Sequence, residues 1–125
     1  MDKYTVEIVN CTRENALTNK EVVKFKHLEG GIALDKATDN GGTVVIIPDY
    51  AVELNIHNPK SKDSVDYTKY CIVDKNGDVY TTGSEGFWEK FIDIHCDMCE
   101  EEYSLMVFKK PCANRSGEYL TCSIM

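Results

Sequence analysis

The sequence has no long apolar run: no stretch of its 125 residues approaches the roughly 20 consecutive apolar residues that a membrane-spanning helix needs. Its first residues, MDKYTVEIVNCTREN, lack the basic start and the apolar core of a signal peptide. We therefore expect a cytoplasmic protein without a membrane partner. Apolar residues make up 42% and charged residues 28% of the chain, which is typical of one soluble domain over residues 1–125.

Sequence motifs of catalysis are also missing. There is no G-x-S-x-G nucleophile elbow, no phosphate-binding P-loop and no G-x-G-x-x-G. The histidines, His27, His57 and His95, lie in no nucleophile motif, and the carboxylates are scattered along the chain. We therefore expect a binding protein and no enzyme.

Positive charge is in short supply. The formal net charge is −7, and a uniformly acidic surface repels phosphate backbones. Nucleic-acid binding would need the lysines concentrated on one face. The same net charge suits a protein that binds a basic partner.

Alternating apolar and polar residues predict strands in the first half of the chain. These are Lys3–Asn10, Lys20–Leu28 and part of the run TVVIIPDYAVELNIHNP, where Pro48 predicts a bulge or bend. Residues 29–42, with glycine pairs at 30–31 and 41–42, are predicted as a loop. One face of the segment after Pro48 is apolar, with Tyr50, Val52, Leu54 and Ile56.

A hairpin is predicted next. Strands over Tyr67–Val73 and Val79–Thr82 flank an Asn76-Gly77 turn, which is the strongest short-range hairpin signal. The surrounding DKNGD resembles the start of a calcium loop but lacks the full ligand pattern and the closing Glu. We therefore interpret it as a turn.

One helix is predicted, over Glu85–Met98, with Thr82 or Ser84 as its cap. Strands over Tyr103–Pro111 and Glu118–Met125 follow it. We expect one core in which the apolar helix residues meet the long strand and the last strand: Phe87, Trp88, Phe91 and Ile94 with Tyr50, Val52, Leu54, Ile56, Leu120 and Ile124.

This order of elements predicts a mainly β fold, either a β-barrel or a strongly curved antiparallel sheet. A single helix between the third and fourth barrel strands is the layout of the OB-fold. An α+β sheet with one covering helix is the alternative. If the edge of the N-terminal strand is open, it could pair with a second copy to give a homodimer.

Three segments, TTGSEGFWEKFIDI, SLMVFKKP and GEYLTCSIM, resemble a family of small proteins encoded by phages of Firmicutes. The likeness covers the C-terminal half of the chain, from Tyr67 to Met125. The resemblance implies single-stranded-DNA binding in the host cytoplasm, and no catalytic residue accompanies these motifs. That family has no cysteine pair at the end of its helix, so Cys96, Cys99 and Cys112 are departures from its pattern.

The six cysteines allow two interpretations. The sequence IHCDMCEEEY places a C-x-x-C pair where the predicted helix ends, and the three following Glu disfavour a low-pKa redox thiol. In a reducing cytosol, buried free thiols are the simpler interpretation. A structural zinc ion is the other, held by Cys96, Cys99, Cys112 and either His95 or Cys122.

Single-stranded nucleic acids are bound by aromatic side chains that stack on bases and by cations that contact phosphates. The residues with these roles are predicted on two strands and near the last loop: Lys24, Lys26, Tyr67, Lys69, Tyr70, Lys109, Lys110 and Arg115. Tyr and Lys interleaved along DYTKY form the best local signal. Lysines on an edge strand also prevent sheet-to-sheet pairing, so this interpretation stays open as well.

The alternative function belongs to a different class, an inhibitor of a host defence system of the anti-CRISPR type. Such a protein would use carboxylates to engage the basic channel of a nucleic-acid-handling effector. Its contact surface would be the acidic cluster near the end of the helix, made of Asp93, Asp97, Glu100, Glu101 and Glu102. An acidic helix face that is merely solvated explains the same cluster.

Overall fold

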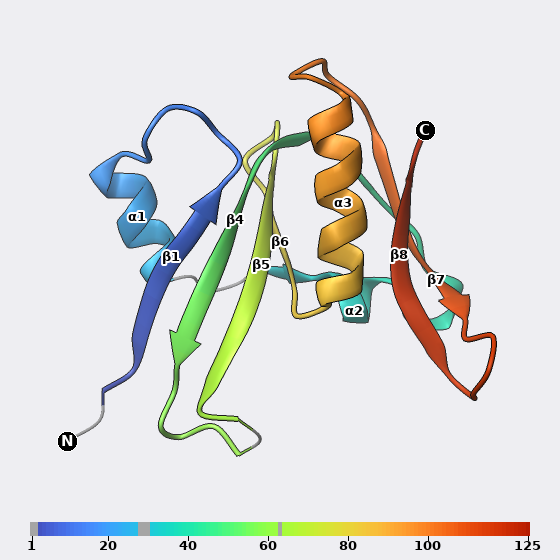
Figure 1. The fold of residues 1–125 in the computed structure, drawn as a ribbon, viewed down its shortest axis with the longest axis horizontal. Coiled ribbons are helices and arrows are strands. Elements are labelled where there is room, and N and C mark those ends of the chain that lie inside the picture. Colours follow the sequence, from blue (N-terminus) through green and yellow to red (C-terminus); the bar gives the residue numbers. More distant parts are fainter. Residues whose placement is uncertain (1–2, 28–30, 63) are drawn as a thin grey trace.

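The chain folds into two β-sheets with a helix packed between them (Figure 1). The computed structural model describes residues 3–27, 31–62 and 64–125. Strands take 41% and helices 24% of it, which confirms the prediction of a mainly β protein. The larger sheet has the spatial order β1 (Thr5–Cys11), β4 (Pro48–His57), β5 (Asp66–Asp74), β6 (Val79–Thr82) and β2 (Ile32–Ala33). The smaller sheet has the order β3 (Val44–Ile46), β7 (Leu105–Pro111) and β8 (Glu118–Ile124).

The sheets do not close into a barrel in the part of the chain that the structure describes. β2 pairs with β6 in parallel, and the other strand pairs of these residues are antiparallel. β1 is one edge of the larger sheet. Pairing of a second copy along β1 stays a prediction.

More helix is present than the one predicted segment. The helices are α1 (Asn19–Lys26), α2 (Leu34–Ala37), the 3-10 turn η1 (Asp39–Gly41) and α3 (Glu85–Asp97). The predicted strand over Lys20–Leu28 is wrong for the residues that are described, and Leu28 lies outside them. Thr18 caps α1 in a capping box with Glu21, and Phe25 is the residue that α1 buries. Two turns of helix are too short for the apolar spacing to separate a period of 3.6 from a period of 2.

The predicted loop over residues 29–42 contains β2, α2 and η1 in its described part, which begins at Gly31. Leu34 anchors it, being fully buried beneath α3 and the smaller sheet. A helix of four residues makes about one turn, so its sequence cannot show apolar residues that recur from turn to turn.

The chain passes from the smaller to the larger sheet at Ile47, between β3 and β4. The break at Pro48 confirms the predicted bend, and the pairing of β4 with β5 is irregular between Pro48 and Tyr50. The carboxylate of Asp74, which is buried, accepts the Ile47 N–H at 2.9 Å and the Asn76 N–H at 2.7 Å. Asp74 thereby ties this crossing to the predicted hairpin turn, where Gly77 has a φ of +92°.

Two cores form, one on each face of the larger sheet. In the α1-side core, Phe25 packs on Val6, Tyr50, Val52, Leu54, Ile56, Cys71 and Val73. In the α3-side core, Phe87, Trp88 and Phe91 pack on both sheets together with Leu120 and Cys122. The predicted single core is therefore wrong: the β4 residues point away from α3, Ile94 is only partly buried, and Ile124 is 47% exposed. A strand in the middle of a two-faced sheet buries both of its faces, which hides the expected alternation.

The predicted helix over Glu85–Met98 is confirmed to within one residue as α3. Ser84 is its cap, since its hydroxyl accepts the Phe87 N–H at 3.2 Å. Thr82 instead accepts the Ser84 N–H and donates to Asp35. Over the described residues, no helix has the length and apolar character required to span a membrane.

Candidate functional site

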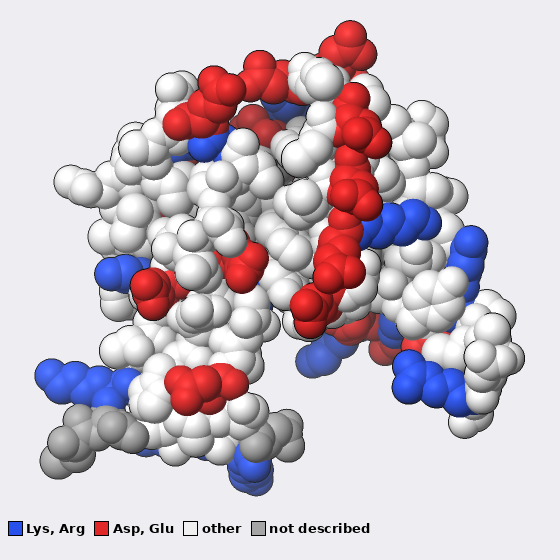
Figure 2. Space-filling view, in the orientation of Figure 1, with Lys and Arg blue, Asp and Glu red and all other residues white. Residues whose placement is uncertain are grey.

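A line of carboxylates runs along the exposed side of α3. Four of them recur at every fourth residue of the helix, which places them on one face, and three follow its end. We name as the acidic stripe these seven exposed residues: Glu85, Glu89, Asp93, Asp97, Glu100, Glu101 and Glu102. Figure 2 shows the stripe as a red band along α3.

Within α3, the stripe residues after Glu85 oppose helix stability, whereas Glu85 lies in the first turn, where the helix dipole favours a carboxylate. Like charges four residues apart cost a few tenths of a kcal/mol per pair, and carboxylates near a helix C-terminus meet the negative end of its dipole. Lys90, the one Lys or Arg of α3, binds the Thr121 hydroxyl at 3.3 Å. No ion pair between described residues includes a member of the stripe. Its charge is therefore presented to solvent without neutralisation.

The turn after α3 has an uncommon backbone. Cys99 and Glu100 have φ values of +50° and +71°, although neither is glycine. Such residues cost of order 1–3 kcal/mol each and persist where the surroundings fix them. Here the turn reverses the chain, so that Glu100, Glu101 and Glu102 lie beside the end of α3 instead of leading away from it.

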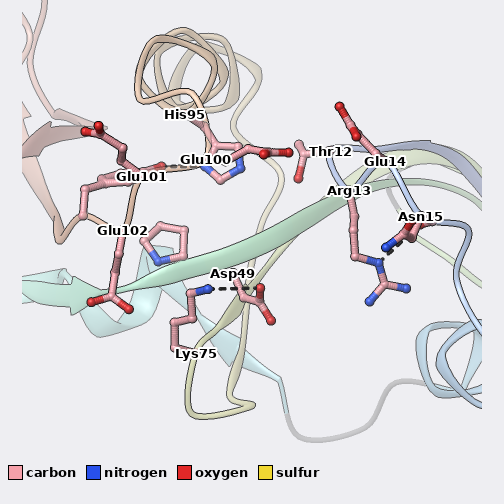
Figure 3. A pocket seen from close by; sticks show the side chains of 12 residues that line it. Thr12, Arg13, Glu14, Asn15, Asp49, Lys75, His95, Glu100, Glu101 and Glu102 are labelled. Carbon is pink, nitrogen blue, oxygen red and sulfur yellow. Dashed lines mark hydrogen bonds and ion pairs between the residues drawn. The ribbon is translucent and has the colours of Figure 1, made fainter.

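These three glutamates line one side of a cleft of about 260 Å³ (Figure 3). Its other walls come from the segment after β1, the start of β4, the hairpin turn, α3 and the segment before β7: Thr12, Arg13, Glu14, Asn15, Pro48, Asp49, Lys75, His95 and Tyr103. Five carboxylates thus share the cleft with two cationic side chains, Arg13 and Lys75. Lys75 lies 3.5 Å from Asp49, so one carboxylate is paired within the cleft.

Arg13 is engaged outside the cleft. Its guanidinium donates to both carboxylate oxygens of Glu21, at 2.6 and 2.8 Å, and lies over the Tyr50 ring. The hydrogen bond from Arg13 lowers the pKa of Glu21 to about 2. Glu21 does not line the cleft, so its carboxylate neutralises Arg13 from outside. The net charge of the cleft is therefore more negative than a count of its own charged side chains gives.

His95 and Tyr103 form the inner wall of the cleft. The His95 Nδ1 lies 2.8 Å from the Tyr103 hydroxyl, and the Phe91 ring stacks on the imidazole. Burial lowers the pKa of His95 and raises the pKa of Tyr103. Both side chains are therefore neutral at pH 7, and their contact bridges the two ends of the turn that carries Glu100–Glu102.

An apolar groove of about 210 Å³ lies between α3, the end of β1 and the first half of β4. Its lining residues are Asn10, Cys11, Thr12, Ala51, Glu53, Trp88 and Ile92. Thr12 also lines the cleft, so the two hollows adjoin. Trp88 is mostly buried, as the sequence predicts, and Tyr70 stacks on it with ring centroids 4.7 Å apart.

The predicted zinc ligands are not brought together. Cys96 and Cys99 are exposed at the end of α3, whereas Cys112 follows β7, whose seven residues span roughly 20 Å. His95 contacts Tyr103, and Cys122 is buried in the α3-side core, where burial raises its pKa to about 11. Within residues 3–27, 31–62 and 64–125, no group of three or more His, Cys, Asp or Glu could hold a metal ion. Zinc does not fit this arrangement.

The predicted nucleic-acid residues are spread over three places. Lys24 and Lys26 lie on α1, not on a strand. Tyr70 is 7% exposed and packed on Trp88, and Lys109 binds the backbone oxygen of Asp35 and the carboxylate of Asp39. At the β7–β8 end, Lys110 lies over the Phe108 ring and Arg115 is exposed.

Tyr67 and Lys69 do share a face. They lie opposite Ile56 and Leu54 in the register of β4 and β5, which places both on the α1 side of the sheet. Tyr4, which no sequence pattern singles out, is 55% exposed on the same side. A nearby hollow of about 240 Å³ is lined by residues that include Tyr4, Lys26 and His27.

The predicted acidic cluster of Asp93, Asp97 and Glu100–Glu102 is part of one continuous surface. Glu85 and Glu89 extend it, and their four-residue spacing in the sequence was the signal for including them. No sequence pattern predicts the groove, because it forms where the end of β1 lies next to α3, and these segments are far apart in the chain. No protein-family model, curated protein or solved structure matches the chain, so its function has to be inferred from its own residues.

Proposed function

We propose that this protein is a non-enzymatic inhibitor that covers the basic nucleic-acid-binding surface of another protein with its acidic stripe. The observation that carries the proposal is the row of unneutralised carboxylates along α3 and the turn after it, where like-charge repulsion and the position of Asp97 at the negative end of the helix dipole oppose helix stability. Sites kept against stability are commonly functional ones. An effector of a host defence system is the class of partner that the sequence suggests.

The charge density of the stripe supports competition with a nucleic acid. Four residues of α-helix rise about 6 Å, so α3 presents one carboxylate per 6 Å. One DNA strand presents one phosphate per roughly 3.4 Å of helix axis. The stripe therefore has about half the linear charge density of a DNA strand, and Glu100–Glu102 add three charges at one end.

A matched pair of triple variants tests the proposal. Glu89→Gln, Asp93→Asn and Glu101→Gln remove three of the seven charges of the stripe, whereas Glu7→Gln, Asp78→Asn and Glu118→Gln remove the same charge from exposed sites elsewhere. Wild type and the control variant are expected to capture a nucleic-acid-binding protein from host lysate and to displace a labelled oligonucleotide from it. The stripe variant should do so at least tenfold more weakly.

The stripe variant should also melt at the same or a higher temperature, because it loses like-charge repulsion. Loss of binding would then have no folding explanation. Equal capture and displacement by both triple variants would reject the acidic stripe as the contact surface.

Single-stranded-DNA binding is the second candidate, favoured by one observation. Tyr4 and Tyr67 are exposed on the side of the larger sheet that carries Lys69, and Lys26 lies beside Tyr4. This side of β1, β4 and β5 would act as an OB-like binding face, with stacking worth about 1–3 kcal/mol per base. The net charge of −7 makes such binding weak and sensitive to salt.

The two candidates separate in a titration of labelled oligothymidylate at low salt. If the second holds, Tyr67→Ala and Lys69→Ala each weaken binding by about tenfold, a loss of about 1.4 kcal/mol. Lys69→Ala also reduces the salt slope, whereas Tyr67→Ala leaves the slope unchanged. A flat anisotropy signal from wild type at low salt would remove this candidate.

A further inference from the structure

We propose that the groove beside the acidic stripe receives an apolar side chain from a Lys- and Arg-rich segment of the partner protein. This inference rests on the proposed function and adds what the stripe alone does not specify, the chemistry of the contacting segment. The segment would place one apolar side chain in the groove and its cations on the carboxylates around it.

The groove has an apolar floor between two acidic rims. Ile92 and the small exposed part of Trp88 supply the floor, while Ala51, which also borders the groove, is fully buried. On α3 the next residue after each floor residue is a stripe carboxylate, Glu89 after Trp88 and Asp93 after Ile92, about 100° further round the helix. On the opposite wall Glu53 accepts a hydrogen bond from Asn10 at 3.3 Å.

The size of the groove fits a side chain and not a free small molecule. Its volume is about 210 Å³, whereas small-molecule sites usually measure about 300–1,000 Å³. The opposite face of the Trp88 ring is occupied by Tyr70, so the indole is fixed in place as one wall. A single leucine or methionine side chain is therefore the occupant that this floor can cover.

Charge decides the rest of the occupant. The rims and the adjoining cleft carry carboxylates, which repel acidic peptides and nucleic acids and attract Lys and Arg. Because the cleft begins at Thr12, where the groove ends, cations next to the apolar residue would reach Glu100, Glu101 and Glu102. A peptide segment with one apolar residue followed by several Lys or Arg residues therefore matches the groove and the acidic cleft that adjoins it.

Trp88 is the only tryptophan of the chain, so its emission reports on the groove directly. Two fluorescein-labelled peptides serve as probes, acetyl-Gly-Leu-Lys-Arg-Lys-Lys and the same peptide with Ser in place of Leu. Fluorescein anisotropy measures affinity, and unlabelled peptides are used to follow Trp88 emission. The Leu peptide is expected to bind about tenfold more tightly and to shift the emission, whereas the Ser peptide leaves it unchanged.

A variant localises the effect. Ile92→Glu removes part of the apolar floor and is expected to bind both peptides equally, whereas Val45→Glu, at an exposed position on the smaller sheet, keeps the tenfold preference. The comparison of the two peptides on wild type needs no variant, so it decides the matter even if Ile92→Glu fails to fold.

Two results would overturn the inference in distinguishable ways. Equal binding of the two peptides without a change in Trp88 emission leaves the acidic stripe as the contact surface and removes the groove from it. Failure of both peptides to bind removes the groove as well, and the triple-variant comparison then decides the proposed function separately.

Discussion

Replacing Phe91 by alanine is expected to lower the free energy of unfolding by about 3–5 kcal/mol, the usual loss for a large aromatic side chain in a core. Phe91 is fully buried at the centre of α3. Its ring contacts those of Phe87, Trp88 and His95, and the α3-side core joins both sheets. The substitution would leave a cavity inside α3's contacts with the two sheets. A shift of one sheet cannot close this cavity, because the two sheets pack on opposite sides of α3.

Urea unfolding followed by Trp88 fluorescence measures this loss. Val45→Ala is the control, since Val45 is 50% exposed on β3 and its truncation should change stability by less than about 0.5 kcal/mol. A loss under 1 kcal/mol for Phe91→Ala would contradict the packing described for α3.

Replacing Asp74 by alanine is expected to lower the free energy of unfolding by about 2–3 kcal/mol. The same substitution at an exposed position of a turn usually has little effect on stability. Asp74 is 4% exposed, and its carboxylate is the acceptor for the Ile47 and Asn76 N–H groups. Removing the side chain leaves the partly buried Ile47 N–H without its acceptor, which costs about 1–3 kcal/mol, and also releases the turn.

Asp74→Asn distinguishes this cause from a general effect of charge. The amide keeps one acceptor oxygen, so its loss of stability should be about half that of alanine. Asp78→Ala removes an exposed carboxylate from the same hairpin turn and is expected to be nearly neutral. Equal stability of Asp74→Ala and Asp78→Ala in urea would show that the hydrogen bond to Ile47 contributes nothing.

Local patterns explain which elements could be predicted. α3 has thirteen residues with helical spacing and a serine cap, the hairpin has an Asn-Gly turn, and Pro48 breaks a long β-rich run. Each signal lies within a few residues of the element it defines. α1 has only eight residues, in which alternating Val23 and Phe25 imitate a strand, and the capping box from Thr18 to Glu21 was the signal that would have corrected this.

Tertiary placement could not be predicted in the same way. The apolar faces of β4 and α3 were each recognisable, but nothing in either segment shows that they lie on opposite sides of the larger sheet. The same limit applies to the site. The acidic residues follow from sequence spacing, whereas the burial of Tyr70 and the pairing of Lys109 with Asp39 depend on contacts with distant segments.

The passage of the chain from β3 to β4 also bears on how the protein folds and unfolds. These strands are separated by Ile47 alone, yet β3 belongs to the smaller sheet and β4 to the larger one. β4 pairs with β1 and β3 pairs with β7, both distant in sequence, so loop closure makes these pairings slow relative to those of consecutive strands, which are β4 with β5, β5 with β6 and β7 with β8. Because only Ile47 separates the two strands, detachment of β3 or β4 from its sheet is expected to loosen the other, which couples the two sheets into one cooperative unit.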